Sequence, residues 1–174
     1  QVCKRWIREF DIDGIRFDVG NEVSHRFLKE LRRQLKSVKP DLYLLGEIWH
    51  DASQWLGGDE YDSVMNYPLR NAIVGFLTYS IDASDLKKLL VSQNQNYPKE
   101  MYYVLMNLLS SHDIARLRTS LAAGADINNL NREQQAKFVV TPLQNARAGR
   151  LQRIAAALQF TLPGMPSVYY GDEV

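Results

Sequence analysis

Apolar residues recur along this chain with two spacings, every second residue or every third to fourth residue, and the two spacings alternate. A spacing of two predicts a strand, and a spacing of three to four predicts one buried face of a helix. Nearly continuous apolar runs also suit strands that are buried on both faces. The pattern therefore predicts strands that alternate with helices, which is typical of βαβ units and a parallel sheet.

Five segments are predicted to be strands, namely 14–19, 42–48, 61–66, 104–110 and 166–170. The predicted helices are 1–10, 21–39, 68–77, 85–93, 132–139 and 146–162. The helix predicted at 21–39 is amphipathic, with one apolar stripe and several Lys and Arg residues on its opposite face. Loops are expected at 49–60 and at 120–142, the second loop containing the short helix. We expect the chain to be a piece of a longer protein, because both ends resemble cut elements.

Polar residues capable of chemistry follow each predicted strand: Arg16 and Asp18, Glu47, Asn66, His112 and Asp113, and Asp172 and Glu173. Right-handed crossovers place the carboxyl ends of parallel strands at one face of the sheet. Polar groups gathered there are typical of a (β/α)8 barrel active site. The alternative, an open doubly wound sheet, usually carries a glycine-rich first turn, and no such motif or P-loop is present. The expected fold is α/β, a partial (β/α)8 TIM barrel with about five parallel strands.

Composition narrows the class of protein further. The chain has 174 residues, 45% of them hydrophobic, and a formal net charge of +1, so a globular domain is expected and neither nucleic acid nor a membrane is indicated as a partner. Cys3 is the only cysteine, which excludes an internal disulfide framework and a multi-cysteine zinc site.

Three acids, Asp18, Glu47 and Asp113, should converge on one pocket if the strand ends meet. Glycoside hydrolysis needs two carboxylates that face the scissile bond, an ionised one and one that donates a proton. Arg16 points to the same side of its strand as Asp18 and should keep that carboxylate ionised, which suits a nucleophile. Apolar neighbours should disfavour the charge of Glu47, which suits the acid.

Simpler roles compete with these assignments for every residue. Arg16 and Asp18 could form a structural ion pair at a strand tip, and a lone Glu after a strand is most often a cap or a solvated loop residue. His112 and Asp113 could stabilise a turn, and Trp49 could belong to the core instead of forming a sugar-facing wall with His50. A hard cation among the carboxylates is also conceivable, although no closely spaced ligand set supports it. The joint occurrence of these residues at successive strand ends favours chemistry.

Three segments of the chain resemble signature regions of the α-amylase family of glycoside hydrolases, in the family's order: Gly14–Glu22, Gly46–Trp49 and Ser111–Asp113. Two further segments, Met65–Leu69 and Pro163–Glu173, also resemble that family. The segment with Asn21 and Glu22, together with Met65–Leu69, leans toward the neopullulanase, cyclomaltodextrinase and maltogenic amylase branch. The resemblance covers essentially the whole chain. It differs at Gly20, where this branch commonly has Ala, and at Ile114, where Thr is common.

The resemblance implies a role for each matching residue. Asp18 resembles the catalytic nucleophile, Glu47 the general acid/base and Asp113 the transition-state stabiliser. The substrate-binding residues expected beside them are Arg16, His112, Asn21, Glu22, Trp49 and His50. Family members are retaining enzymes that act on α-glucosidic bonds, so the expected substrates are α-glucans, maltooligosaccharides or cyclodextrins.

The resemblance also implies that much of the family's architecture lies outside this chain. Only barrel strands four to eight are matched, whereas the first three strands, the inserted loop domain and the C-terminal β-sandwich are missing. We therefore expect residues 1–174 to self-associate through open sheet edges and to be weakly active or inactive alone. No cofactor is expected within this stretch, and calcium is possible in the full-length protein. The alternatives are an α-glucan transglycosylase and a non-catalytic carbohydrate-binding barrel module.

Overall fold

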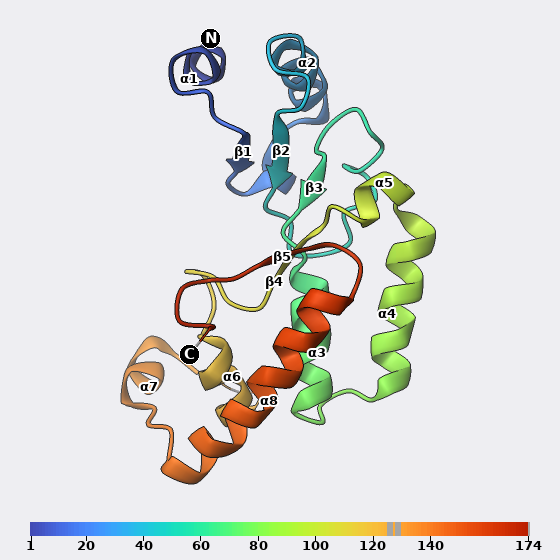
Figure 1. Ribbon diagram of the computed structural model, residues 1–174. Helices are drawn as coiled ribbons and strands as arrows, with labels where there is room; N and C mark the ends of the chain where they lie inside the picture. Colours follow the sequence, from blue (N-terminus) through green and yellow to red (C-terminus); the bar gives the residue numbers. More distant parts are fainter. Residues whose placement is uncertain (125–126, 128–129, 174) are drawn as a thin grey trace.

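A computed structural model describes residues 1–124, 127 and 130–173 (Figure 1). The first part of the chain contains α1 (Val2–Phe10), β1 (Gly14–Phe17), the 3-10 helix η1 (Gly20–Glu22), α2 (His25–Lys36), β2 (Tyr43–Gly46) and β3 (Ser63–Val64). The second part contains α3 (Tyr67–Leu77), α4 (Ala83–Asn96), α5 (Lys99–Tyr102), β4 (Met106–Leu108), α6 (Leu117–Ala123), α7 (Arg132–Lys137), α8 (Pro142–Thr161) and β5 (Met165–Ser167).

The strands pair in parallel and in chain order. β1, β2 and β3 form one sheet, and β4 pairs with β5 in a second sheet. An isolated parallel bridge between Met65 and Met106 connects β3 to β4, so neighbours along the chain are neighbours in space. The prediction of parallel strands joined by helices is confirmed, and residues 47–62 join β2 to β3 without a helix, as expected for that loop.

The apolar residues pack in layers on both faces of the first sheet, as the spacing of apolar residues in strands and helices predicts. Leu44 of β2 packs with Leu28 and Leu35 of α2 on one face of the first sheet, whereas Leu45 packs with Tyr67 on the other face. A separate cluster joins α3, α4, α6 and α8. Figure 1 shows α1 and α2 side by side above the first sheet and α3, α4 and α8 gathered in the other part of the molecule.

Several element boundaries differ from the sequence prediction. The helix expected at 21–39 is divided, because Ser24 caps a helix that starts only at His25, its Oγ accepting a hydrogen bond from the Phe27 N–H at 3.4 Å. Similarly, a capping box between Thr141 and Gln144 starts α8 at Pro142 instead of residue 146. The helices α5 and α6 were not predicted. Asn128 and Asn129, part of the loop predicted at 120–142, lie outside the described residues.

Candidate active site

The carboxyl ends of β1 and β2 bring the first two candidate acids together. Phe17 is in register with Gly46, and the Glu47 N–H donates to the Phe17 carbonyl at 3.0 Å, so Asp18 and Glu47 leave neighbouring strands side by side. Val19 then turns the chain with a left-handed backbone, φ 47°. In that conformation its N–H donates to Oε2 of Glu47 at 2.9 Å.

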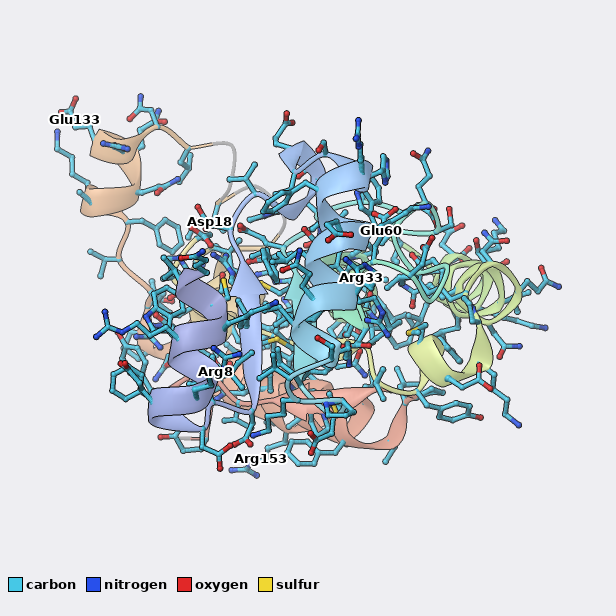
Figure 2. All side chains as sticks on the ribbon, turned by 90° about the horizontal axis from the view of Figure 1, so that it is seen from above. Arg8, Asp18, Arg33, Glu60, Glu133 and Arg153 are labelled. Carbon is cyan, nitrogen blue, oxygen red and sulfur yellow. The ribbon has the colours of Figure 1, made fainter. Side chains whose placement is uncertain are left out.

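Arg16 lies between the two acids. Its Nη1 donates to Asp18, and its Nη2 lies 2.9 Å from Oε2 of Glu47, an ion pair without the alignment of a hydrogen bond. The Glu47 side chain is 8% exposed and that of Asp18 is 76% exposed. Asp18 is labelled in Figure 2, near the end of β1. One guanidinium therefore orients a buried carboxylate and an exposed one at the same time.

The surroundings of Glu47 correct one expectation. Apolar neighbours were predicted for its carboxylate, but it meets the Val19 N–H, Arg16 and the indole Nε1 of Trp49, which donates to Oε1 at 3.1 Å. The strand residues before Glu47 are apolar, but these donors come from the end of β1 and from the following loop. The positive charge of Arg16 is shared by both acids, so it does not distinguish their roles.

Tyr67 connects this cluster to the end of β4. Its ring stacks on Trp49, with centroids 3.8 Å apart and planes 7° apart, and its hydroxyl lies 3.0 Å from Oγ of Ser111. Burial raises the pKa of Tyr67, the hydrogen bond with Ser111 opposes that rise, and the charges of Asp113 and Glu47 add to it. The hydroxyl is therefore neutral and available as a hydrogen-bond partner at neutral pH.

His112 and Asp113 lie on the far side of Tyr67. The Asp113 N–H donates to Oγ of Ser111 at 3.1 Å, and Nε2 of His112 lies 3.2 Å from Oδ2 of Asp113. Both residues line one hollow together with Trp49, Arg70 and other side chains. The contacts therefore run without a gap from Glu47 through Trp49, Tyr67 and Ser111 to Asp113.

Three expected substrate-binding residues lie outside this chain of contacts. Asn21 and Glu22 lie on η1, where Nδ2 of Asn21 donates to Oε1 of Glu22 at 3.1 Å. His50 is exposed, with Nδ1 2.9 Å from the Asp51 carbonyl and its ring 5.7 Å from that of Trp55. Their assignment to the substrate stays a prediction.

Sequence reasoning gave no role to Tyr67, Ser111 or Arg70. Tyr67 and Ser111 belong to segments that resemble the family. The resemblance located these segments, but it did not indicate the contacts that the two side chains make. Arg70 gave no signal, because a single Arg in a predicted helix usually faces water.

Within residues 1–124, 127 and 130–173, no three His, Cys, Asp or Glu side chains gather closely enough to hold a metal ion. Of the helices described there, none combines the length and the apolar character needed to cross a bilayer.

Comparisons with known proteins agree on one family. Residues 1–174 match the profile described as "Alpha amylase, catalytic domain". The chain is 44% identical to a cyclomaltodextrinase of a Bacillus species, over 100% of this chain and 27% of that protein. It is 40% identical to neopullulanase 2 of Thermoactinomyces vulgaris, over 99% of this chain and 26% of that protein. The chain thus spans about a quarter of the length of these relatives.

Solved structures give the same result. A cyclomaltodextrinase structure has a TM-score of 0.78 and 43% identity, covering 99% of this chain and 26% of that one. A cyclic α-maltosyl-(1→6)-maltose hydrolase from Arthrobacter globiformis has a TM-score of 0.81 and 34% identity, covering 99% and 34%. The resemblance to the cyclomaltodextrinase and neopullulanase branch is thereby confirmed.

Proposed function

Because the chain belongs to the α-amylase catalytic domain family, we propose that the protein carrying it is a retaining glycoside hydrolase acting on α-1,4-glucosidic bonds. The proposed substrates are α-glucans, maltooligosaccharides or cyclodextrins, in line with the names of its relatives. The observation that carries the proposal is the cluster of Asp18 and Glu47 around Arg16. Two carboxylates at neighbouring strand ends are the groups that this chemistry requires.

The proposed reaction has two steps. In the first step, Glu47 protonates the leaving oxygen while Asp18 attacks the anomeric carbon, which forms a covalent glycosyl-enzyme. In the second step, Glu47 takes a proton from water and the water displaces Asp18 with retention of configuration. Asp113 and His112 hold sugar hydroxyls, and Asp113 binds more strongly in the transition state. These steps use side chains of the chain and water, with no cofactor.

We place the five strands as strands four to eight of a closed (β/α)8 barrel. The parallel order from β1 to β5 and the quarter of its relatives' length that the chain spans support this placement. The rest of the barrel, an inserted loop domain and a C-terminal β-sandwich would lie outside residues 1–174. In the described sheets β1 and β5 each pair on one side only, so we expect the isolated 174-residue chain to self-associate. A monodisperse monomer in light scattering would contradict this.

Hydrolysis of β-cyclodextrin, pullulan and starch by the full-length protein tests the proposed function. Glu47→Gln should lower kcat/KM by about 10²–10⁴-fold, the usual contribution of a general acid and base. Products analysed with a labelled sugar acceptor separate hydrolysis from transglycosylation by the same residues. If wild type and Glu47→Gln are equally inert on all three substrates, the proposal is wrong and a carbohydrate-binding role replaces it.

A further inference from the structure

Arg70 of α3 is a buried cation without a carboxylate partner among the described residues. Its exposed fraction is 2%, and none of the carboxylates in residues 1–124, 127 and 130–173 forms an ion pair with it. Burial lowers its pKa, opposed by the nearby Tyr67 and Asp172. Burying a charge without a counter-ion is unfavourable. The three hydrogen bonds that the Arg70 side chain donates offset this cost, and their acceptors show what the residue holds.

Those hydrogen bonds reach both ends of the segment that carries His112 and Asp113. Nε of Arg70 donates to the carbonyl of Leu109, directly after β4, at 3.2 Å. Nη2 donates to Oγ of Ser120 on α6 at 2.9 Å. One side chain on α3 thus fixes residue 109 and residue 120, the two ends of the segment.

A second set of contacts extends this hold into the middle of the segment. The Ser120 hydroxyl donates to the Ala115 carbonyl at 3.3 Å. Oγ of Ser110 accepts the Leu117 N–H at 2.9 Å and donates to Asp172 at 2.7 Å. Arg70 also lines the hollow that His112 and Asp113 line.

We propose that Arg70 is a positioning residue, which holds residues 109–120 so that His112 and Asp113 face the substrate. This inference rests on the proposed glycosidase function, since it assigns a purpose to Asp113. The planar guanidinium supplies donors in fixed directions, so it can reach Leu109, Asn71 and Ser120 at once, with Nη1 3.1 Å from Oδ1 of Asn71. The ammonium of a lysine carries the charge but not this fork.

The test uses the full-length protein with Arg70→Lys and Arg70→Met. The matched control is Arg33→Met, because Arg33 is an exposed arginine on α2 whose partner is Glu30 (Figure 2). Hydrogen exchange of the amides of Asp113 and Leu117 reports the segment directly and needs no activity. Steady-state kinetics on β-cyclodextrin then separate kcat from KM.

We expect both Arg70 variants to exchange these two amides about tenfold faster, with α3 unchanged, and Arg33→Met to match wild type. We also expect kcat to fall by about 10²-fold in Arg70→Met and less in Arg70→Lys, with KM changed by less than threefold. Unchanged exchange overturns the inference, and so does faster exchange with an unchanged kcat. If Arg70→Met does not fold, a folded Arg70→Lys with wild-type exchange and kcat overturns it equally. An inactive wild type refutes the proposed function, and the exchange data still decide the positioning role.

Discussion

Two acids of the candidate site, Glu47 and Asp113, are held by the fold in different ways. The Glu47 carboxylate is contacted directly by the Val19 N–H, the Arg16 guanidinium and the Trp49 indole. In the described part of the chain, the Asp113 carboxylate pairs with His112, while its backbone N–H donates to Oγ of Ser111. The first acid is fixed at the carboxylate itself, and the second through the position of its segment.

The difference indicates where substitutions act. Residues around Glu47 touch the carboxylate that we propose as the acid/base, so changing them should alter the chemical step. Residues around Asp113, namely Tyr67, Ser111 and Arg70, touch the backbone or neighbours of the acid, so changing them should alter its placement. Trp49 and Tyr67 stack on each other and connect the two regions.

Among substitutions of the residues that surround the acids, the largest effect is expected from Arg16→Met. This change removes the cation that both Asp18 and Glu47 contact, so kcat should fall by about 10²–10³-fold, as for loss of a preorganised electrostatic group. Stability should fall as well, because Glu47 is left buried without its counter-ion. The measurements are kcat/KM on β-cyclodextrin and the urea midpoint, with Arg33→Met as the control. Equal kinetics in Arg16→Met and Arg33→Met would contradict the prediction that the Arg16 guanidinium supports the chemical step through its contact with Glu47.

Asp62→Asn should weaken the framework below Glu47 without touching the acid. Asp62 accepts the Leu44 N–H at 2.8 Å and pairs with Arg32 at 2.7 Å and Lys36 at 2.9 Å. Losing this partly buried carboxylate, which accepts three hydrogen bonds, should lower the free energy of unfolding by about 1–3 kcal/mol. The matched control is Asp59→Asn, which breaks an exposed pair with Lys29 and should cost about 0–1 kcal/mol. Equal losses in both variants in urea denaturation would contradict the prediction.

The same carboxylate predicts a pH dependence of stability. Burial alone would raise the pKa of Asp62, but hydrogen bonds from Lys36, the Leu44 N–H and Arg32 outweigh burial and hold the pKa below its ordinary value. Its contribution is therefore fully present above the unfolded-state pKa of about 3.9 and is lost as the pH falls through the lower folded-state value. Urea midpoints between pH 6 and pH 3 should fall more steeply in wild type than in Asp62→Asn, and parallel curves would count against this.

Tyr67→Phe should act more weakly, and on the Asp113 side. The change keeps the stack on Trp49 but removes the hydroxyl contact with Ser111, worth about 1 kcal/mol or a fivefold effect. The effect should appear in kcat and in the exchange of the Asp113 amide. Tyr103→Phe, at a half-exposed position, is the control. A loss above about 100-fold would mean that the Tyr67 hydroxyl touches the substrate, and would contradict an action through the placement of Asp113.

The smallest effect is expected from Gly20→Ala. A Cβ at this position would lie 3.0 Å from the Glu47 nitrogen and 3.1 Å from the Tyr61 hydroxyl. Gly20 does not have a left-handed backbone, so the added methyl group causes a packing strain only, of about 1 kcal/mol. Alanine also lowers the conformational entropy of the unfolded chain, which offsets about 0.4–1 kcal/mol of this cost. Thermal unfolding should therefore shift by a few degrees at most, and a collapse of activity would show that Glu47 tolerates no backbone movement.

The sequence predicted the strands and long helices because their signals are local. The alternation at 14–19, the apolar run at 42–48 and the stripe at 21–39 each correspond to β1, β2 or α2 in the structure. Helix starts were predicted less well, since Ser24 decides one through a capping hydrogen bond and Thr141 decides another through a capping box with Gln144. The strand predicted at 61–66 is reduced to Ser63–Val64, because only these two residues pair with β2 as a ladder.

The strand-end positions of the three candidate acids were predicted from the sequence, but the groups that contact the Glu47 carboxylate were not. Asp18, Glu47 and Asp113 stand at strand ends, which a sequence pattern can locate. The Val19 N–H could not be predicted as a donor to Glu47, because it faces the carboxylate only through a left-handed turn between β1 and η1. Arg70 donates to the carbonyl of Leu109, 39 residues further along the sequence. No local pattern encodes a contact between residues so far apart.

Trapping the covalent intermediate in the full-length protein tests the roles proposed for Asp18 and Glu47. A glycosyl fluoride needs no protonation to lose its fluoride, so a Glu47→Gln variant should still be glycosylated but should hydrolyse the adduct slowly for want of a base. Peptide mass spectrometry after brief reaction should then find one glycosyl group on Asp18 and none in an Asp18→Asn, Glu47→Gln double variant. An adduct on another residue would contradict the assignment of Asp18 as nucleophile and Glu47 as acid/base. The absence of any adduct, together with release of a product of inverted configuration, would contradict it as well.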